Sequence, residues 1–251
     1  MSEHFVEERG VSLAWGRALQ IVSRPGRNEL APLTVAITGA DTEEVLSEHD
    51  VIRGELDKVL RAAGKQTVET VANTIFPDSL WNPSRPRNEF FDRYLSIYPR
   101  LRKRWQANRR GTYFQRMIAN GRKDEPNQLE FGLSAYGRGK MRRSVLQAGV
   151  FDPRKDHSAA TRSGFPCLQH LSFVPDKAGN LSVNAFYASQ SLVERGYGNY
   201  LGICRLGRFV AHELDRPLTR VTCHIGLAML DRTKRSIAGV LSAVEAEMGK
   251  L

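Results

Sequence analysis

A pair of adjoining strand-like segments places the strongest constraint on how this chain can fold. Residues 171–175 and 181–187 contain apolar, β-branched and aromatic side chains, and the turn-forming stretch Asp176-Lys177-Ala178-Gly179 joins them. Segments of this kind favour strands, and a short linker with aspartate and glycine suits a turn between them. We therefore expect a β-sheet that contains this strand pair.

The rest of the chain predicts helices and a few further strands. Further strands are expected at residues 33–38, 128–137, 143–149 and 220–224. Helices are expected at residues 11–22, 43–63, 66–75, 88–120 (broken near Pro99), 199–213 and 233–248. Helices and strands do not alternate strictly, which favours an α+β fold over a doubly wound parallel sheet. The 251 residues contain no internal repeat, so a single domain spanning residues 1–251 is expected.

The chain carries a net charge of +10, and most of the excess is arginine. Three interpretations are open: a solvated basic surface, a site for an anionic small ligand, or a nucleic-acid surface. The basic residues are spread along the chain, which makes nucleic acid the least favoured of the three. The run from Arg100 to Arg110 interleaves basic residues with Trp105, and a solvated helix face is preferred there over nucleic-acid contact.

Cysteine usage and hydropathy predict a cytoplasmic protein that does not bind a membrane. No run approaches the roughly 20 apolar residues that a membrane span needs, and the first residues do not resemble a secretory signal. Three cysteines without CxxC spacing suit a reducing compartment. A zinc site built from Cys204, Cys223 and His224 lacks the usual ligand spacing, so no metal is predicted.

Cys167 is the first candidate for chemistry. A thiolate is a competent nucleophile where cations or backbone donors stabilise it, and Pro166 fixes the backbone immediately before it. The alternative is an inert, buried thiol, which is the common state of a free cysteine.

Two further polar residues follow Cys167 in the sequence. Asn199 carries an amide that offers a donor and an acceptor together, which suits the edge of a pyrimidine base, although Asn199 is also a good helix cap. His224 lies in a strand-like segment, where a histidine is usually a satisfied core residue.

Several short motifs occur in a fixed order along the second half of the chain. They are Phe165-Pro166-Cys167, then Asn180-Leu181-Ser182 opening a strand, then Ser189, Asn199 heading a helix, and His224 after the next strand. In this order they resemble the family of thymidylate synthases and pyrimidine nucleotide hydroxymethylases. That family has a Pro-Cys nucleophile, a strand that begins Lys-Leu-Ser, an Arg-Ser pair, an asparagine heading a helix, and a later histidine. The resemblance covers about residues 141–231, and residues 181–199 align without a gap.

The resemblance implies a fold, a partner and a reaction. The fold is a thymidylate synthase-like sheet whose exposed face packs on a second copy, giving a homodimer. Cys167 adds to C6 of a pyrimidine nucleotide, and C5 then attacks a one-carbon unit from 5,10-methylenetetrahydrofolate. Glu69 is implied to organise proton transfers and Asn199 to read a uracil-type base, because the cytosine-specific members carry an acid there. The remaining implied ligands are His224 for the sugar and Ser189, Arg27, Arg142 and Arg143 for the phosphate.

The sequence also departs from the family pattern at identifiable positions. Ala188 replaces the phosphate-binding arginine, Ser191 replaces the folate-positioning aspartate, and the chain ends at Leu251, where the family continues with further strands and a tail. These departures predict altered or absent folate use, and both alternatives stay open. The other functional alternatives are a nucleotide sensor that has lost one-carbon transfer and a basic nucleic-acid-binding protein.

Overall fold

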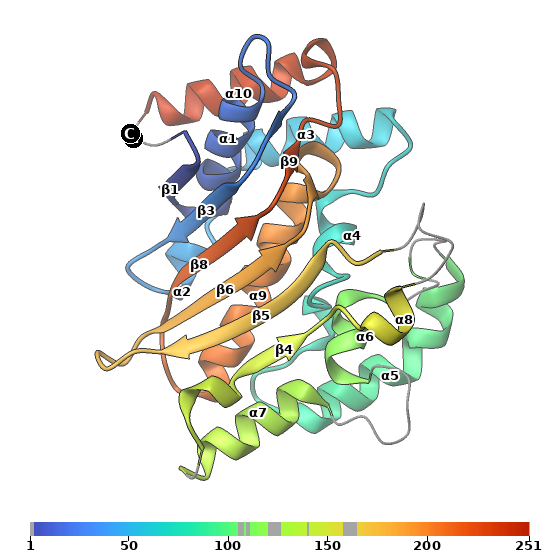
Figure 1. Ribbon diagram of the computed structural model, residues 1–251, viewed down its shortest axis with the longest axis vertical. Coiled ribbons are helices and arrows are strands. Elements are labelled where there is room, and N and C mark those ends of the chain that lie inside the picture. The colour runs from blue at the N-terminus through green and yellow to red at the C-terminus, as the bar shows by residue number, and fades with distance from the viewer. Residues whose placement is uncertain are drawn as a thin grey trace.

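The centre of the molecule is a six-stranded mixed β-sheet. The structure is a computed structural model of residues 1–251, in which residues 3–104, 108, 111–119, 127–139, 141–157 and 165–250 are described. The strand order is β1-β3-β8-β6-β5-β4 (Figure 1). These strands are β1 (Phe5–Arg9), β3 (Leu33–Thr38), β4 (Gln147–Gly149), β5 (Leu168–Pro175), β6 (Leu181–Tyr187) and β8 (Leu218–Ile225). Strands β1 and β3 are parallel, as are β6 and β8, and the other neighbours are antiparallel.

The predicted strand pair is confirmed as the β5–β6 hairpin. Its turn is closed by a hydrogen bond from the Asp176 amide to the Asn180 carbonyl (2.9 Å), and the Asp176 side chain accepts from the Asn180 amide (2.8 Å). Gly179 has a φ of 96°, which a residue without a Cβ adopts at little cost. The turn residues therefore set the register that aligns the far ends of the two strands.

Helices cover one face of the sheet. In β6 the odd-numbered residues are buried against them and the even-numbered residues point away, as the pleat requires. Helix α1 packs on β1 and β3, and α9 packs on β6 and β8; Figure 1 shows both behind the sheet. The helices are α1 (Gly10–Val22), α2 (Thr42–Val45), α3 (Asp50–Ala62), α4 (Val68–Ala72), α5 (Arg87–Arg104), α6 (Tyr113–Ile118), α7 (Gln128–Gly137), α8 (Pro153–Asp156), α9 (Tyr197–Glu213) and α10 (Ala238–Met248). The predicted α+β class is thus confirmed.

Helix α4 lies unusually close to α9 because two glycines of α9 face it. A Cβ built on Gly198 would lie 2.8 Å from the Val68 carbonyl oxygen and 2.6 Å from the Val71 Cβ. A Cβ on Gly202 would lie 2.8 Å from the Ala72 carbonyl oxygen. These contacts fix the position of the segment that carries Glu69.

We expect Gly198→Ala to lower the free energy of unfolding by about 2 to 3 kcal/mol, because the new methyl group meets backbone that cannot move aside cheaply. Gly54→Ala is the matched control. Gly54 lies in helix α3, and a Cβ added to it would have no atom within 4 Å, so alanine should raise the free energy of unfolding by about 0.5 to 1 kcal/mol. Urea titration of both variants measures the difference, and an equal response from the two would contradict the close packing.

A second, three-stranded sheet gathers segments that are distant in the sequence. Its order is β2-β9-β7, with β2 (Glu29–Leu30), β9 (Ala228–Met229) and β7 (Gln190–Ser191). It ties the loop after α1, which contains Arg27, to the residues that follow β6 and β8. The small sheet therefore lies next to the end of the main sheet where β5 begins and where β6 and β8 end.

Several predicted elements are corrected by the structure. Residues 128–137, predicted as a strand, form helix α7, because the Asn127 side chain caps its start by accepting from the Glu130 amide (3.0 Å). Only Gln147–Gly149 of the predicted strand 143–149 is extended, since Arg143–Val145 forms a 3-10 turn.

The long predicted helices also differ from the structure. Helix α5 continues through Pro99 instead of breaking there, and the predicted helix 43–63 is two helices, α2 and α3. Strand β1 is not predicted from the sequence, because three of its five residues are charged and give no strand pattern, although it pairs with β3. Trp105, Arg109 and Arg110 of the basic run lie outside the described residues.

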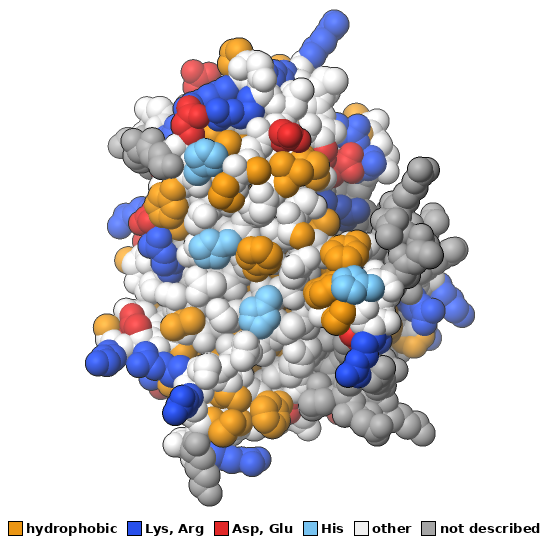
Figure 2. Space-filling view, viewed as in Figure 1, with side chains coloured by type: hydrophobic (Ala, Val, Ile, Leu, Met, Phe, Trp, Pro, Cys, Tyr) orange, Lys and Arg blue, Asp and Glu red, His pale blue; other side chains and the backbone are white. Residues whose placement is uncertain are grey.

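The face of the sheet opposite α1 and α9 is open. One row across it consists of His170, Phe186, His224, Thr34 and Phe5, which pair in register on five successive strands. Phe186 and Phe5 remain 48% and 43% exposed. Figure 2 shows hydrophobic and histidine side chains in the middle of this face, with most Lys and Arg side chains toward its margin.

Candidate functional site

Cys167 and Ser189 lie side by side where the β5–β6 hairpin opens. Cys167 directly precedes β5, and its carbonyl accepts from the Ala188 amide (3.0 Å). Its Sγ is 3.8 Å from the Ser189 Oγ. Cys167 is partly exposed, whereas Cys204 and Cys223 are buried, and burial raises the pKa of both. The inert, fully buried state considered for a free cysteine therefore fits Cys204 and Cys223, and the hairpin joins two of the predicted site residues.

Tyr113 contributes a phenol to the same place, and no sequence motif predicts it. It is the first residue of α6, which Thr112 caps by accepting from the Gln115 amide (3.1 Å). Desolvation raises the pKa of Tyr113 to about 12, against the opposing effect of hydrogen bonds with the backbone of Leu168 and Cys167. The phenol thus remains protonated at neutral pH beside the Cys167 backbone.

Tyr187 connects the Cys167 region with the head of α9. It is fully buried at the end of β6, and it interacts electrostatically with Cys167, Tyr113 and Tyr200. Burial raises the pKa of Tyr187 well above its usual value, and its hydroxyl has no hydrogen-bond partner among the described residues. Tyr187 pairs with Leu168 across the hairpin and so lies next to Cys167 in the sheet, and Tyr200, which follows Asn199, is also fully buried.

Asn199 is not the helix cap that was considered for it. A π-helical turn, Leu192–Gly196, leads directly into α9, so Asn199 lies inside continuous helical backbone. The residue is 3% exposed, and its amide makes no hydrogen bond with the part of the chain that the structure describes. An amide that no protein group pairs with is free to donate to and accept from a bound molecule, which makes Asn199 a candidate ligand for a polar molecule.

Glu69 is held by two arginines from other elements. Its carboxylate accepts from Arg205 of α9 (2.7 and 2.9 Å) and from Arg53 of α3 (2.8 Å). Desolvation works to raise its pKa, but these bonds outweigh it and hold the pKa of Glu69 at about 2. The side chain is therefore a carboxylate at neutral pH, with its oxygens committed to the two guanidinium groups.

This pairing predicts a pH-dependent contribution to stability. The folded pKa of about 2 lies below the ordinary value of 4.5, so the contribution is complete above about pH 5 and is lost as the pH falls towards 2. We expect Glu69→Gln to lower the free energy of unfolding at pH 7 by about 1 to 2 kcal/mol, discounted for solvent screening, and by less at pH 4. Urea titrations at the two pH values check this, with Glu55→Gln in an exposed pair as control. A deficit that is the same at both pH values would contradict it.

The predicted phosphate and sugar ligands are distributed over three places. Arg27 pairs with Glu3 (2.7 Å) beside the small sheet. His224 points to the open face, 3.4 Å from Thr34 Oγ1, and so lies on the side of the sheet opposite α9. Arg143 donates to the Pro175 carbonyl (2.8 Å), and Arg142 is exposed beside it. Pro175 ends β5, so this pair lies more than about 20 Å along the strand from Cys167.

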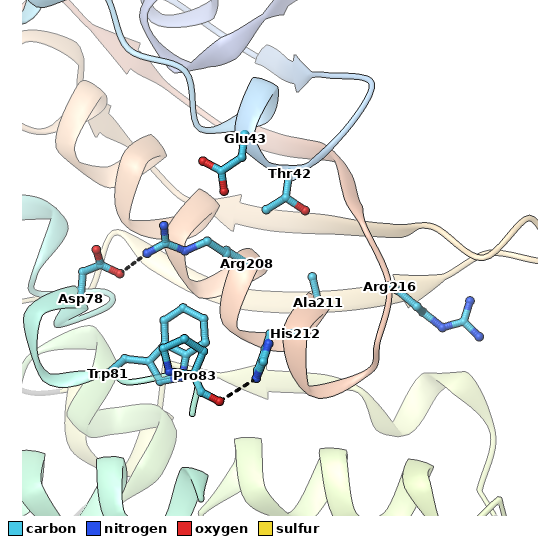
Figure 3. Close-up of a pocket in the computed structure, with 9 residues that line it drawn as sticks. All are labelled: Thr42, Glu43, Asp78, Trp81, Pro83, Arg208, Ala211, His212 and Arg216. Carbon is cyan, nitrogen blue, oxygen red and sulfur yellow. Dashed lines mark hydrogen bonds and ion pairs between the residues drawn. The ribbon is translucent and has the colours of Figure 1, made fainter. Parts of the chain in front are cut away.

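A separate open cavity of about 510 Å³ lies at the other end of α9. Two of its polar side chains are held by protein partners: Arg208 pairs with Asp78 (2.5 Å) and stacks on Trp81, and His212 bonds the Pro83 carbonyl (3.1 Å). Figure 3 shows Arg216 pointing away from the cavity. None of the predicted site residues lines this cavity, so we assign no site there.

The described part of the chain offers neither a metal-ligand cluster nor a membrane-spanning helix. Within it, no group of three or more His, Cys, Asp or Glu residues is arranged to hold a metal ion. No helix in the same set of residues is both long and apolar enough to cross a membrane.

The comparisons with known proteins do not add a family to this geometry. No family model matches the chain, and no curated sequence matches it either.

Proposed function

We propose that this protein binds a pyrimidine nucleotide and activates C5 of the ring by adding the Cys167 thiolate to C6. The observation that carries the proposal is the partly exposed thiol 3.8 Å from the Ser189 hydroxyl. The resemblance assigns a nucleophile and a phosphate ligand to these same two positions. The protonated Tyr113 phenol and the unpartnered Asn199 amide supply further polar contacts in this region.

The proposed chemistry begins with the formation of a C6–S bond. The electrons of the C5–C6 double bond move to C5 and the adjoining carbonyl, giving an enolate. C5 then takes a proton from solvent, and in the reverse direction C5 loses a proton and the thiolate leaves. The cycle exchanges the C5 hydrogen with water and needs no further reactant.

The base preference follows from Asn199. Uracil presents a carbonyl acceptor at O4 beside an N3–H donor, and the Asn199 amide can donate to the first and accept from the second. Burial of the amide strengthens the discrimination, because a mismatched base leaves polar groups unpaired inside the protein. A uracil nucleotide is therefore the proposed ligand.

Folate does not fit the residues at the corresponding position. Ser191, which stands where the family has its folate-positioning aspartate, belongs to strand β7 and offers only a neutral hydroxyl. The charge that would orient a pterin is thus missing at that position. The proposed reaction therefore stops at activation of C5 and includes no one-carbon transfer.

We further propose a thymidylate synthase-like homodimer formed through the open sheet face. That face carries Phe186 on the inner strand β6, Phe5 on the edge strand β1 and Val174 near the end of β5, all more than a third exposed. Figure 2 shows hydrophobic side chains in the middle of the face and most Lys and Arg side chains toward its margin, which is the pattern of an interface core and rim. Within one chain Arg142 and Arg143 lie too far from Cys167 to share its ligand. In the proposed dimer, Arg142 and Arg143 of one copy would approach the nucleotide phosphate bound by the other copy.

Phe186→Glu should convert the dimer to a monomer, because it buries a charge at the centre of the proposed interface. Light scattering coupled to size exclusion measures the mass. Phe131→Glu is the control, since Phe131 is 54% exposed on helix α7 and does not belong to a strand of the sheet, and it should leave the mass unchanged. A monomeric wild-type protein would overturn the dimer without affecting the ring chemistry.

The proposed reaction is tested by following C5 hydrogen exchange of dUMP in D2O by NMR. The expected result is loss of the C5 proton signal with the wild-type protein. Thermal stabilisation by dUMP without exchange would instead favour a nucleotide sensor. The pairing of Glu69 with Arg205 and Arg53 favours the nucleotide sensor, because both arginines bind the carboxylate that is predicted to transfer protons.

A further inference from the structure

Arg195 occupies the π-helical turn immediately before α9, four residues ahead of Asn199. It donates a hydrogen bond to Gln66 Oε1 and interacts electrostatically with Tyr113, whose phenol contacts the Cys167 backbone. Residues four apart lie on the same side of a helix. Arg195 is thus directed to the same region as the proposed ring-binding residues.

The turn that carries Arg195 is held firmly at several points. The Asp231 carboxylate accepts from the Val193 and Glu194 amides (2.9 and 3.0 Å), and the Trp15 indole donates to the Leu192 carbonyl (2.8 Å). A π-helical turn is uncommon and is frequently found at functional sites. The position of the Arg195 backbone is therefore defined by contacts with α1 and with the segment after β9.

Among the described residues, Arg195 has no carboxylate partner. The adjacent Glu194 is committed to Lys65 (3.1 Å) and Arg232. No ion pair within the described ranges involves Arg195, although it is partly buried. Arg53 and Arg205, which are also partly buried, are both paired with Glu69. This contrast indicates that the Arg195 guanidinium pairs with an anion that is not one of the described residues.

Gln66 supplies an independent sign of a missing partner. It is 8% exposed, and its Nε2 is buried without a hydrogen-bond partner among the described residues. Its Oε1 orients the Arg195 guanidinium and uses one of the five N–H donors. The remaining donors include a pair with the spacing that a phosphate or carboxylate accepts.

We infer that Arg195, oriented by Gln66, forms an oxyanion-binding subsite for the ligand attacked by Cys167. This inference rests on the proposed function and deepens it. The oxyanion is the phosphate of the pyrimidine nucleotide, for which position 188 lacks an arginine. Charge-assisted hydrogen bonds to this phosphate let the site distinguish a nucleotide from a nucleoside.

Calorimetric titration with dUMP and deoxyuridine tests whether Arg195 holds the phosphate. Arg195→Gln should weaken dUMP binding by about 10- to 100-fold and leave deoxyuridine binding unchanged. Arg235→Gln, at an exposed arginine of the 3-10 turn Lys234–Ile237, should change neither of these affinities.

Arg195→Lys tests whether an effect of Arg195→Gln comes from lost recognition or from poor folding. Lysine keeps the positive charge, so this variant should recover part of the dUMP affinity that Arg195→Gln loses. Unchanged binding of both probes by Arg195→Gln overturns the inference while the proposed function stands. An equal loss for deoxyuridine and dUMP also overturns it, since the nucleoside carries no oxyanion. Failure of the wild-type protein to bind either pyrimidine probe overturns the proposed function, and the subsite falls with it.

Discussion

We expect replacement of Cys167 by alanine to abolish the proposed C5 hydrogen exchange of dUMP, with a fall of at least about 1000-fold to the uncatalysed background. The proposed step forms its only covalent bond through this sulfur, and no other described thiol can substitute for it, because Cys204 and Cys223 are buried with raised pKa values. Binding of dUMP should persist, since its recognition is assigned to Asn199, Ser189 and the arginines. NMR in D2O measures the exchange, and the thermal shift with dUMP measures the binding.

Cys204→Ala is the control for this experiment. Cys204 lies buried in α9, so its truncation should cost about 1 kcal/mol of stability and leave exchange at the wild-type rate. Exchange by Cys167→Ala at the rate of the wild-type protein would falsify the thiolate mechanism. Loss of both exchange and dUMP binding in a folded Cys167→Ala protein would contradict the assignment of recognition to the other residues.

Sequence patterns predict those elements of the fold that neighbouring residues in the chain determine by themselves. The β5–β6 hairpin follows from its aspartate and glycine turn, and the helix at 199–213 from its length and apolar spacing. The strand prediction for residues 128–137 is wrong because the signal that decides them is the Asn127 cap and not their weak apolar pattern. Short helices and charged edge strands such as β1 depend on their neighbours, and this context is absent from a local window.

The sequence predicts only the part of the candidate site that lies on the β5–β6 hairpin. Cys167 and Ser189 meet because the register of β5 and β6 brings them together, and the resemblance assigns a role to both. Tyr113 and Gln66 reach the region through tertiary packing of segments more than 50 residues away in sequence, and no motif surrounds either of them. The pairing of Glu69 with Arg205 joins residues 136 positions apart, so its effect on the Glu69 pKa is visible only in the folded molecule.

Asn199→Asp should reverse the base preference of the site. A carboxylate at this position repels the O4 carbonyl of uracil and cannot donate to it, whereas it accepts from the exocyclic amine of cytosine. In a buried setting such a mismatch costs enough to weaken dUMP binding by about 100-fold. We expect the ratio of dUMP to dCMP affinity to fall by at least that factor, as measured by calorimetric titration.

The same substitution at an exposed asparagine isolates the effect of charge. Asn88→Asp, at the solvent-facing start of helix α5, changes the net charge equally and should leave the ratio of affinities untouched. If Asn199→Asp weakens both nucleotides by the same factor, the amide has a structural role in the first turn of α9 and does not read the base. If the ratio follows the carboxylate, the base edge lies against Asn199.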